Sequence, residues 1–192
     1  MSSGDVSDTV EGDNKGAKNM ANPARLFLHY LGRLKNLLLQ IDACDPDISG
    51  NRLHPDMFPL WQQATTAIGF TLRASCPLAG REIASFRTES ATVRGALVEL
   101  DATMAYLAAI PEADFDAVDA MQVQSAAGFA HLELPAADYY TLYAMPNFFF
   151  HYAMVYAIAR QAGLPIGKAD FDGFHTYPPG FTFTNECDAA GS

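Results

Sequence analysis

Residues 136–162 constrain the fold of this chain most, because their side chains are apolar on nearly every side of a helical projection. Gly163 and then Pro165 follow, which is the usual order at the end of a helix. The segment therefore predicts a central, buried helix. Pro146 falls inside the pattern and has no amide hydrogen, so it must kink this helix or split it at Met145.

Two segments before it also have helical periodicity. Residues 23–42 carry one apolar face, and Asn22 is a good N-cap for them. Residues 59–75 carry apolar side chains spaced by four. We expect Asp56 to cap this second helix and Pro77 to prevent its continuation.

A third helical segment and a hairpin precede the apolar helix. In residues 88–110 the apolar side chains are alternately four and three residues apart, which is typical of a helix that packs in a bundle. Thr88 is the expected N-cap of this helix. Residues 121–124 and 130–134 then alternate apolar with polar side chains, with a turn around Gly128. The pattern predicts an all-α four-helix bundle with a small β-hairpin between helices three and four.

Length and charge limit the classes of function. The 192 residues correspond to one ordinary domain with tails, which we place at residues 22–175. Residues 1–21 are polar and acidic and predict a disordered tail, and residues 176–192 predict a loose C-terminal tail. The net charge of −10 argues against nucleic acid as a partner. No apolar run reaches the length of a membrane span, which argues against a membrane partner.

The cysteines indicate a reducing compartment. The chain has three cysteines without CxxC spacing, and the N-terminus has no apolar stretch of a signal peptide. Free thiols in the cytoplasm are the expected state, and a reactive cysteine is the less favoured alternative, because no cationic setting is visible. The three residues are Cys44, Cys76 and Cys187.

A polar stripe crosses the apolar fourth helix. Tyr143, Asn147 and His151 are spaced by four, so they share one helix face. Trp61 and Gln63 on the second helix are the side chains expected to reach the same interior. A buried polar stripe needs partners, and two interpretations stay open: a satisfied core network, or one wall of a ligand pocket.

His54 and Asp56 lie in the segment LHPDMFPL, which two prolines stiffen before the second helix. A helix cap is the favoured interpretation of Asp56, and a metal-ligand or acid–base pair with His54 is the alternative. The other histidines are expected to be structural or at the surface, with His131 facing solvent. They are His29, His131 and His175.

Three motifs in order carry a family resemblance: LHPDMFPL, MPNFFFH and GLPIGKADF. Over residues 23–173 the chain resembles the family known as domain of unknown function nineteen-ninety-three, a branch of the DinB/YfiT-like superfamily of proposed metalloenzymes. The resemblance implies a four-helix bundle, often a homodimer. It also implies a divalent metal held by three histidines and, in some members, thiol-dependent transferase or isomerase chemistry.

The chain departs from that three-histidine pattern. His151 matches one position on the fourth helix, but Asn147 and Val155 stand four residues to either side of it. His54 lies before the second helix begins. A site of His54, His151 and Asp56 around zinc or nickel is the remaining metal hypothesis.

Three functions follow as hypotheses. The first is a small-molecule-binding bundle with a degenerate or absent metal site, its pocket lined by the polar stripe and its partners. The second is a divalent-metal-dependent enzyme acting on a thiol conjugate or a small electrophile. The third is a homodimeric structural or interaction protein that uses the aromatic fourth helix as its dimer face.

Overall fold

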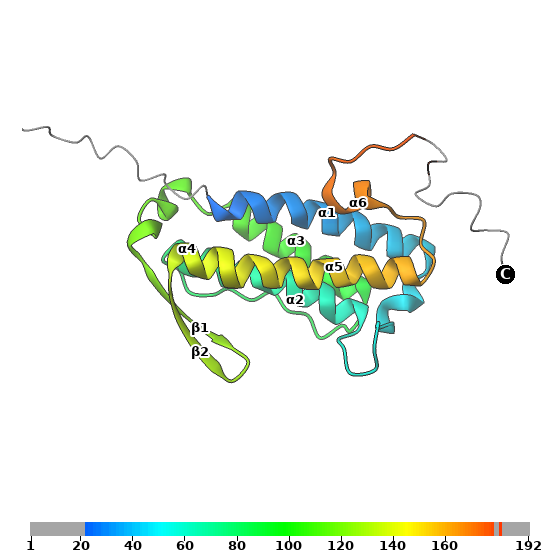
Figure 1. The fold of residues 1–192 in the computed structure, drawn as a ribbon, viewed down its shortest axis with the longest axis horizontal. Coiled ribbons are helices and arrows are strands. Elements are labelled where there is room, and N and C mark those ends of the chain that lie inside the picture. Colours follow the sequence, from blue (N-terminus) through cyan, green and yellow to red (C-terminus); the bar gives the residue numbers. More distant parts are fainter. Residues whose placement is uncertain (1–21, 179–180, 182–192) are drawn as a thin grey trace, which may run out of the picture.

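The computed structural model of the chain describes residues 22–178 and Phe181. The predicted acidic tail and most of the predicted C-terminal tail lie outside these residues. Four long helices form the bundle, and Figure 1 shows them side by side with their axes roughly aligned. They are α1 (Pro23–Cys44), α2 (Leu60–Leu78), α3 (Val93–Ala108) and α5 (Met145–Gln161).

Helix α1 forms as its sequence predicts. The Asn22 side chain accepts a hydrogen bond from the Ala24 amide at 2.9 Å, which satisfies one of the free donors of the first turn. The helix ends at Cys44, two residues later than expected. The short 3₁₀ helix η1 (Pro46–Gly50) follows, because the proline ring cannot continue the α-helical hydrogen bonds.

Helix α2 differs from the prediction at both ends. It begins after Pro59, and Asp56 does not cap it, since its carboxylate pairs with His54 instead. Pro77 lies within the last turn rather than beyond it, and the helix runs to Leu78. A proline there leaves the carbonyl of Arg73 without its usual amide donor. The hydroxyl of Tyr139 supplies that donor at 2.9 Å.

Helix α3 begins later than predicted. Thr92, not Thr88, is the N-cap, and its hydroxyl accepts from the Gly95 amide at 3.1 Å. The residues before Thr92 form an extended segment that passes close over the first turn of α3. A Cβ atom on Gly95 would lie 2.4 Å from the Ser90 carbonyl oxygen, so the close approach requires glycine at this position.

The two strands β1 (Gln122–Ala127) and β2 (Ala130–Pro135) form the predicted antiparallel hairpin, which projects from one end of the bundle (Figure 1). The strands are longer and the turn is shorter than expected. Only Gly128 and Phe129 connect them, and Gly128 adopts a φ of 60°, which a tight two-residue turn needs.

The fourth helix accommodates Pro146 by changing its winding. The helix starts as α4 (Ala136–Asp138), passes through a π-helical segment η4 (Tyr139–Ala144) and becomes α-helical as α5 at Met145. Pro146 thus lies in the first turn of α5, where a missing amide hydrogen costs little. The π-helical segment therefore divides the helix at Met145, as the sequence predicts.

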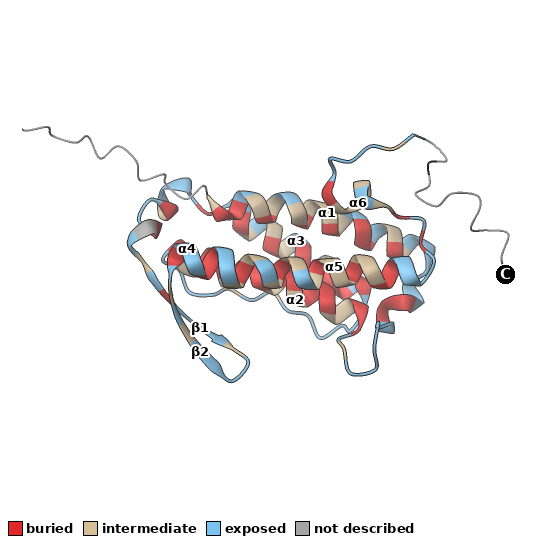
Figure 2. Cartoon of the chain, viewed as in Figure 1, coloured by how far each residue is buried: buried red, intermediate tan, exposed pale blue. Residues whose placement is uncertain are grey.

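The core lies between the long helices. Figure 2 shows the buried residues concentrated on these helices, while the hairpin is mostly exposed. Phe27 of α1 and Phe148 of α5 are fully buried and pack edge to face, with ring centroids 5.2 Å apart. A short helix α6 (Lys168–Asp172) packs on α1, where Arg33 donates to the Ala169 carbonyl at 3.0 Å. None of the helices in the described part of the chain combines the length and the apolar character of a membrane span.

Candidate functional site

His151 of α5 faces α2 and contacts Gln63 there. The His151 Nδ1 lies 2.7 Å from Gln63 Oε1, and Gln63 Nε2 donates to the Phe58 carbonyl at 3.2 Å. Because the amide oxygen can only accept, Nδ1 is the donor in this pair. The arrangement therefore places the imidazole proton on Nδ1 and the lone pair on Nε2.

The imidazole lies in an aromatic slot. Its ring is nearly parallel to the rings of Phe58 and Phe70, at centroid distances of 6.1 and 5.8 Å, and the edge of Phe150 meets it at 5.1 Å. Burial lowers the pKa of His151 below the ordinary value of 6.5. The side chain is thus a neutral imidazole near pH 7.

The second nitrogen of His151 is open. Among the described residues Nε2 has no hydrogen-bond partner, and it is not one of the fully enclosed polar atoms. Phe58 and Phe150 beside it are 43% and 52% exposed, so the slot reaches the surface. The site presents a fixed lone pair at an apolar opening, which can accept a hydrogen bond or take up a proton.

Arg73 extends the aromatic slot toward the hairpin. Its guanidinium lies over the Phe70 ring, 4.6 Å from the centroid. One terminal nitrogen donates to the Ala126 carbonyl of β1 at 2.7 Å and to the Tyr143 hydroxyl at 3.0 Å, and that hydroxyl donates to the same carbonyl. These contacts join the hairpin to the bundle.

The structure brings together part of the predicted ligand-binding set. Gln63 and His151 are bonded to each other, and Tyr143 contacts their neighbour Phe70 edge to face at 5.9 Å. Asn147 donates to the carbonyl of Tyr143 in its own helix at 2.7 Å. Trp61 is half-buried, and its indole does not stack with any ring in the described part of the chain.

Sequence reasoning missed Phe58, Phe70 and Arg73. Phe70 follows Gln63 by seven residues and therefore lies on the same face of α2, so its place beside His151 could have been predicted from the spacing. Phe58 precedes the helix, and its ring reaches His151 only because the loop folds back.

The residues proposed as metal ligands do not form one group. The His54 and Asp56 side chains pair with each other and are 66% and 80% exposed, whereas His151 contacts Gln63. Across residues 22–178 and Phe181, no three or more His, Cys, Asp or Glu side chains are grouped so as to hold a metal ion. The donors present therefore do not fit the three-ligand site that the family resemblance implies.

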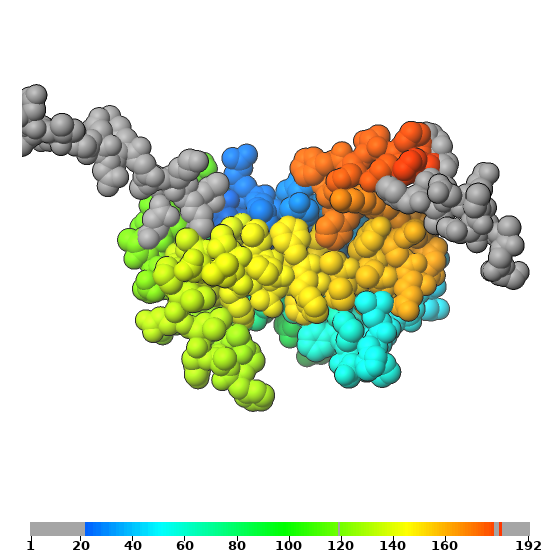
Figure 3. Space-filling model, in the orientation of Figure 1, coloured from blue at the N-terminus to red at the C-terminus, as the bar shows by residue number. Residues whose placement is uncertain are grey.

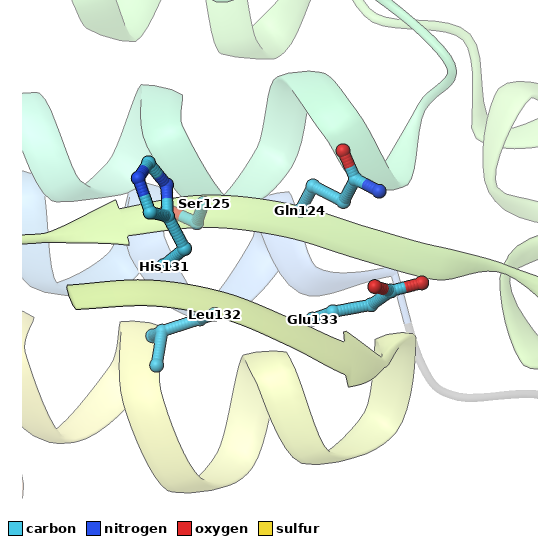
Figure 4. A pocket seen from close by; sticks show the side chains of 5 residues that line it. All are labelled: Gln124, Ser125, His131, Leu132 and Glu133. Atoms are coloured by element: carbon cyan, nitrogen blue, oxygen red, sulfur yellow. The ribbon is translucent and has the colours of Figure 1, made fainter.

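The other histidines lie away from the slot. His131 is exposed on the hairpin, as expected, beside a hollow of about 480 Å³. Figure 4 shows Gln124 and Glu133, which are paired across the strands, at one end of this hollow. His29 of α1 contacts the backbone carbonyl of Asp172, the last residue of α6, and His175 contacts the carboxylate of the same residue.

The fold defines the class of protein. A crystal structure of a DinB family member from Shewanella denitrificans superposes with a TM-score of 0.69, covering 81% of this chain and 92% of that chain at 23% sequence identity. The chain has this DinB-like helical fold, and its small hairpin lies between α3 and α5, the third and fourth long helices.

The chain belongs to the family described as "Domain of unknown function (DUF1993)", whose model matches residues 24–172, from the first turn of α1 to the end of α6. This confirms the family resemblance drawn from the three motifs. No curated protein matches the chain.

Proposed function

We propose that the protein is a small-molecule-binding bundle and that its ligand donates a hydrogen bond to Nε2 of His151. The observation that supports this proposal is the open lone pair on a neutral imidazole whose orientation is fixed by Gln63. A side chain already held in one rotamer and one tautomer loses little entropy when it binds a ligand. A satisfied core histidine would instead have partners at both ring nitrogens.

The surroundings of Nε2 indicate the chemistry of the ligand. Phe58 and Phe150 are partly exposed at the opening and offer apolar contact, and burial of the imidazole disfavours its charged form. A small neutral molecule with one apolar part and one O–H or N–H donor fits this environment best, for example a phenol or an indole.

A direct test is nitrogen NMR of the ¹⁵N-histidine-labelled protein, titrated with phenol, indole and imidazole derivatives. We expect the Nε2 signal of His151 to move from the free-acceptor position as a ligand binds. The replacement His151→Phe keeps the stacking and removes the nitrogen, so it should abolish binding while the fold persists. His131→Phe on the exposed hairpin is the matched control. Binding that survives His151→Phe unchanged would contradict the proposal.

One observation favours a second candidate, self-association through the fourth helix. Leu142 and Phe150 are 71% and 52% exposed, and the exposed Pro146 lies midway between them on the same face. In Figure 3 this helix, coloured yellow, lies across the middle of the face in view. Light scattering of the full chain tests this candidate. A dimer that Leu142→Glu converts to monomer would support it, and a monomer at all concentrations would exclude it.

The metal-enzyme alternative has weaker support. A divalent-metal enzyme acting on a thiol conjugate would need a set of three donors, which the described residues do not group together. We therefore propose Nε2 of His151, and not a metal ion, as the group that binds the ligand.

A further inference from the structure

A second cavity borders the His151 site at Arg73. It has a volume of about 350 Å³ and is bounded by α2, by α3 and by the extended segment of residues 83–87 that connects them. Figure 1 shows this connection running alongside α2. Neither His151 nor Gln63 lines the cavity. Its walls include the apolar side chains of Leu72 and Phe86.

Glu99 of α3 is the buried acid of this cavity. The residue is only 3% exposed, and among the described residues its carboxyl group has no hydrogen-bond partner. Burial raises the pKa of Glu99, and the nearby charge of Arg87 opposes that rise. Its oxygens are not fully enclosed, and the residue lines this cavity. A buried carboxyl group of this kind requires a donor or a cation for compensation.

Two arginines line the same cavity. Arg87 comes from the connecting segment, is exposed and makes no hydrogen bond with the described residues. Arg73 comes from α2 and uses one terminal nitrogen on Ala126 and Tyr143, which leaves its other guanidinium nitrogens available. Guanidinium groups bind carboxylates through paired, charge-assisted hydrogen bonds.

We propose that this cavity binds a small zwitterion of the amino-acid type. The ligand's ammonium group pairs with the buried carboxylate of Glu99, and its carboxylate pairs with Arg87 and Arg73. Phe86 and Leu72 provide apolar contact for its side chain. The volume lies near the lower end of the range for ligand cavities, about 300–1,000 Å³, which suits a molecule of this size.

The test is isothermal titration calorimetry of the full chain with the common L-amino acids. Each is compared with its N-acetyl derivative, which lacks the ammonium group, and with its carboxamide, which lacks the carboxylate. We expect at least one amino acid to bind, and both blocked forms to bind about tenfold more weakly or worse, because each loses one charged pair.

Two variants assign the binding to this cavity. Glu99→Gln and Arg87→Gln should each weaken binding by about tenfold or more. Glu89→Gln is the control, because Glu89 is exposed on the same connection and does not line the cavity. Arg87 is exposed, so its variant tests the proposal even if Glu99→Gln fails to fold.

Three outcomes would overturn the proposal. They are the absence of binding by every amino acid, equal binding of the free and blocked forms, and affinity unchanged in both variants. The variant His151→Phe should leave the affinity for amino acids intact. Its result therefore separates this cavity from the histidine site, so that either proposal can fail without the other.

Discussion

Replacing Gln63 by leucine should lower the free energy of unfolding by about 1–3 kcal/mol. Gln63 is 1% exposed, and its amide accepts from His151 at 2.7 Å and donates to the Phe58 carbonyl at 3.2 Å. Leucine has a similar size and keeps the packing, but it leaves the Nδ1 donor without a partner. The Phe58 carbonyl belongs to a residue that is 43% exposed, so water can replace its lost donor and the imidazole accounts for most of the cost.

A double-mutant cycle isolates the hydrogen bond. His151→Phe removes the donor and retains a ring between Phe58 and Phe70. In that background Gln63→Leu no longer leaves a donor unsatisfied, and replacing both partners by apolar groups can be nearly neutral. We therefore expect a coupling energy of about 1–2 kcal/mol between the two sites, with the double variant more stable than the sum of the single changes predicts.

Urea unfolding followed by circular dichroism measures each corner of this cycle. A loss of 1 kcal/mol corresponds to a shift in Tm of about 2–4 °C for a chain of this size. The control pair combines His151→Phe with Gln161→Leu, an exposed position at the end of α5, and should be additive within about 0.5 kcal/mol. If the Gln63 pair is equally additive, the hydrogen bond does not stabilise the fold and the assigned tautomer loses its support.

Three further predictions concern single groups. Burial places the pKa of His151 below 6.5, so the unfolded chain takes up a proton at a higher pH than the folded protein does. The free energy of unfolding should therefore fall as the pH drops from about 6.5 through the pKa of the folded state. His151→Phe should flatten this part of the plot of urea midpoint against pH. Tyr139→Phe removes the donor to the Arg73 carbonyl, which Pro77 leaves without an amide partner in α2. The change should lower the free energy of unfolding by about 1–2 kcal/mol. An unchanged urea midpoint would show that water replaces the hydroxyl. Gly95→Ala places a Cβ atom 2.4 Å from the Ser90 carbonyl oxygen. The resulting strain should lower the free energy of unfolding by about 1–3 kcal/mol and so lower Tm. A Tm equal to that of the wild type would mean that the connecting segment moves aside freely.

The four helices and the hairpin were predictable because their signals are local. Apolar periodicity, the Asn22 cap and the glycine at the hairpin turn each act within a few residues. Thr88 and Thr92 are both acceptable caps, and the choice between them depends on how the preceding segment packs over α3. Asp56 is a favourable cap by composition, yet it pairs with His54, and Pro59 stands directly before the helix.

The candidate sites were predictable only in part, because some of their contacts join segments that are distant in the sequence. The pairing of Gln63 with His151 followed from helix faces, which spacing determines. The stacking of Phe58 on that ring depends on a loop that returns to the bundle. Glu99 lies in a helical pattern where glutamate usually faces water, yet it is buried and lines a cavity together with residues 83–87. Contacts between distant segments of this kind leave no periodic signal in the sequence.

The prolines of two neighbouring helices explain why the site is held firmly. Pro77 frees the carbonyl of Arg73 in α2, and the π-helical turn before Pro146 presents Tyr139 to that carbonyl and Tyr143 to the guanidinium of the same arginine. Both ends of Arg73 are therefore fixed by one turn of the neighbouring helix. The guanidinium in turn lies over Phe70 beside the imidazole and also lines the second cavity. Two breaks in regular helical bonding thus position one residue that borders both proposed binding sites.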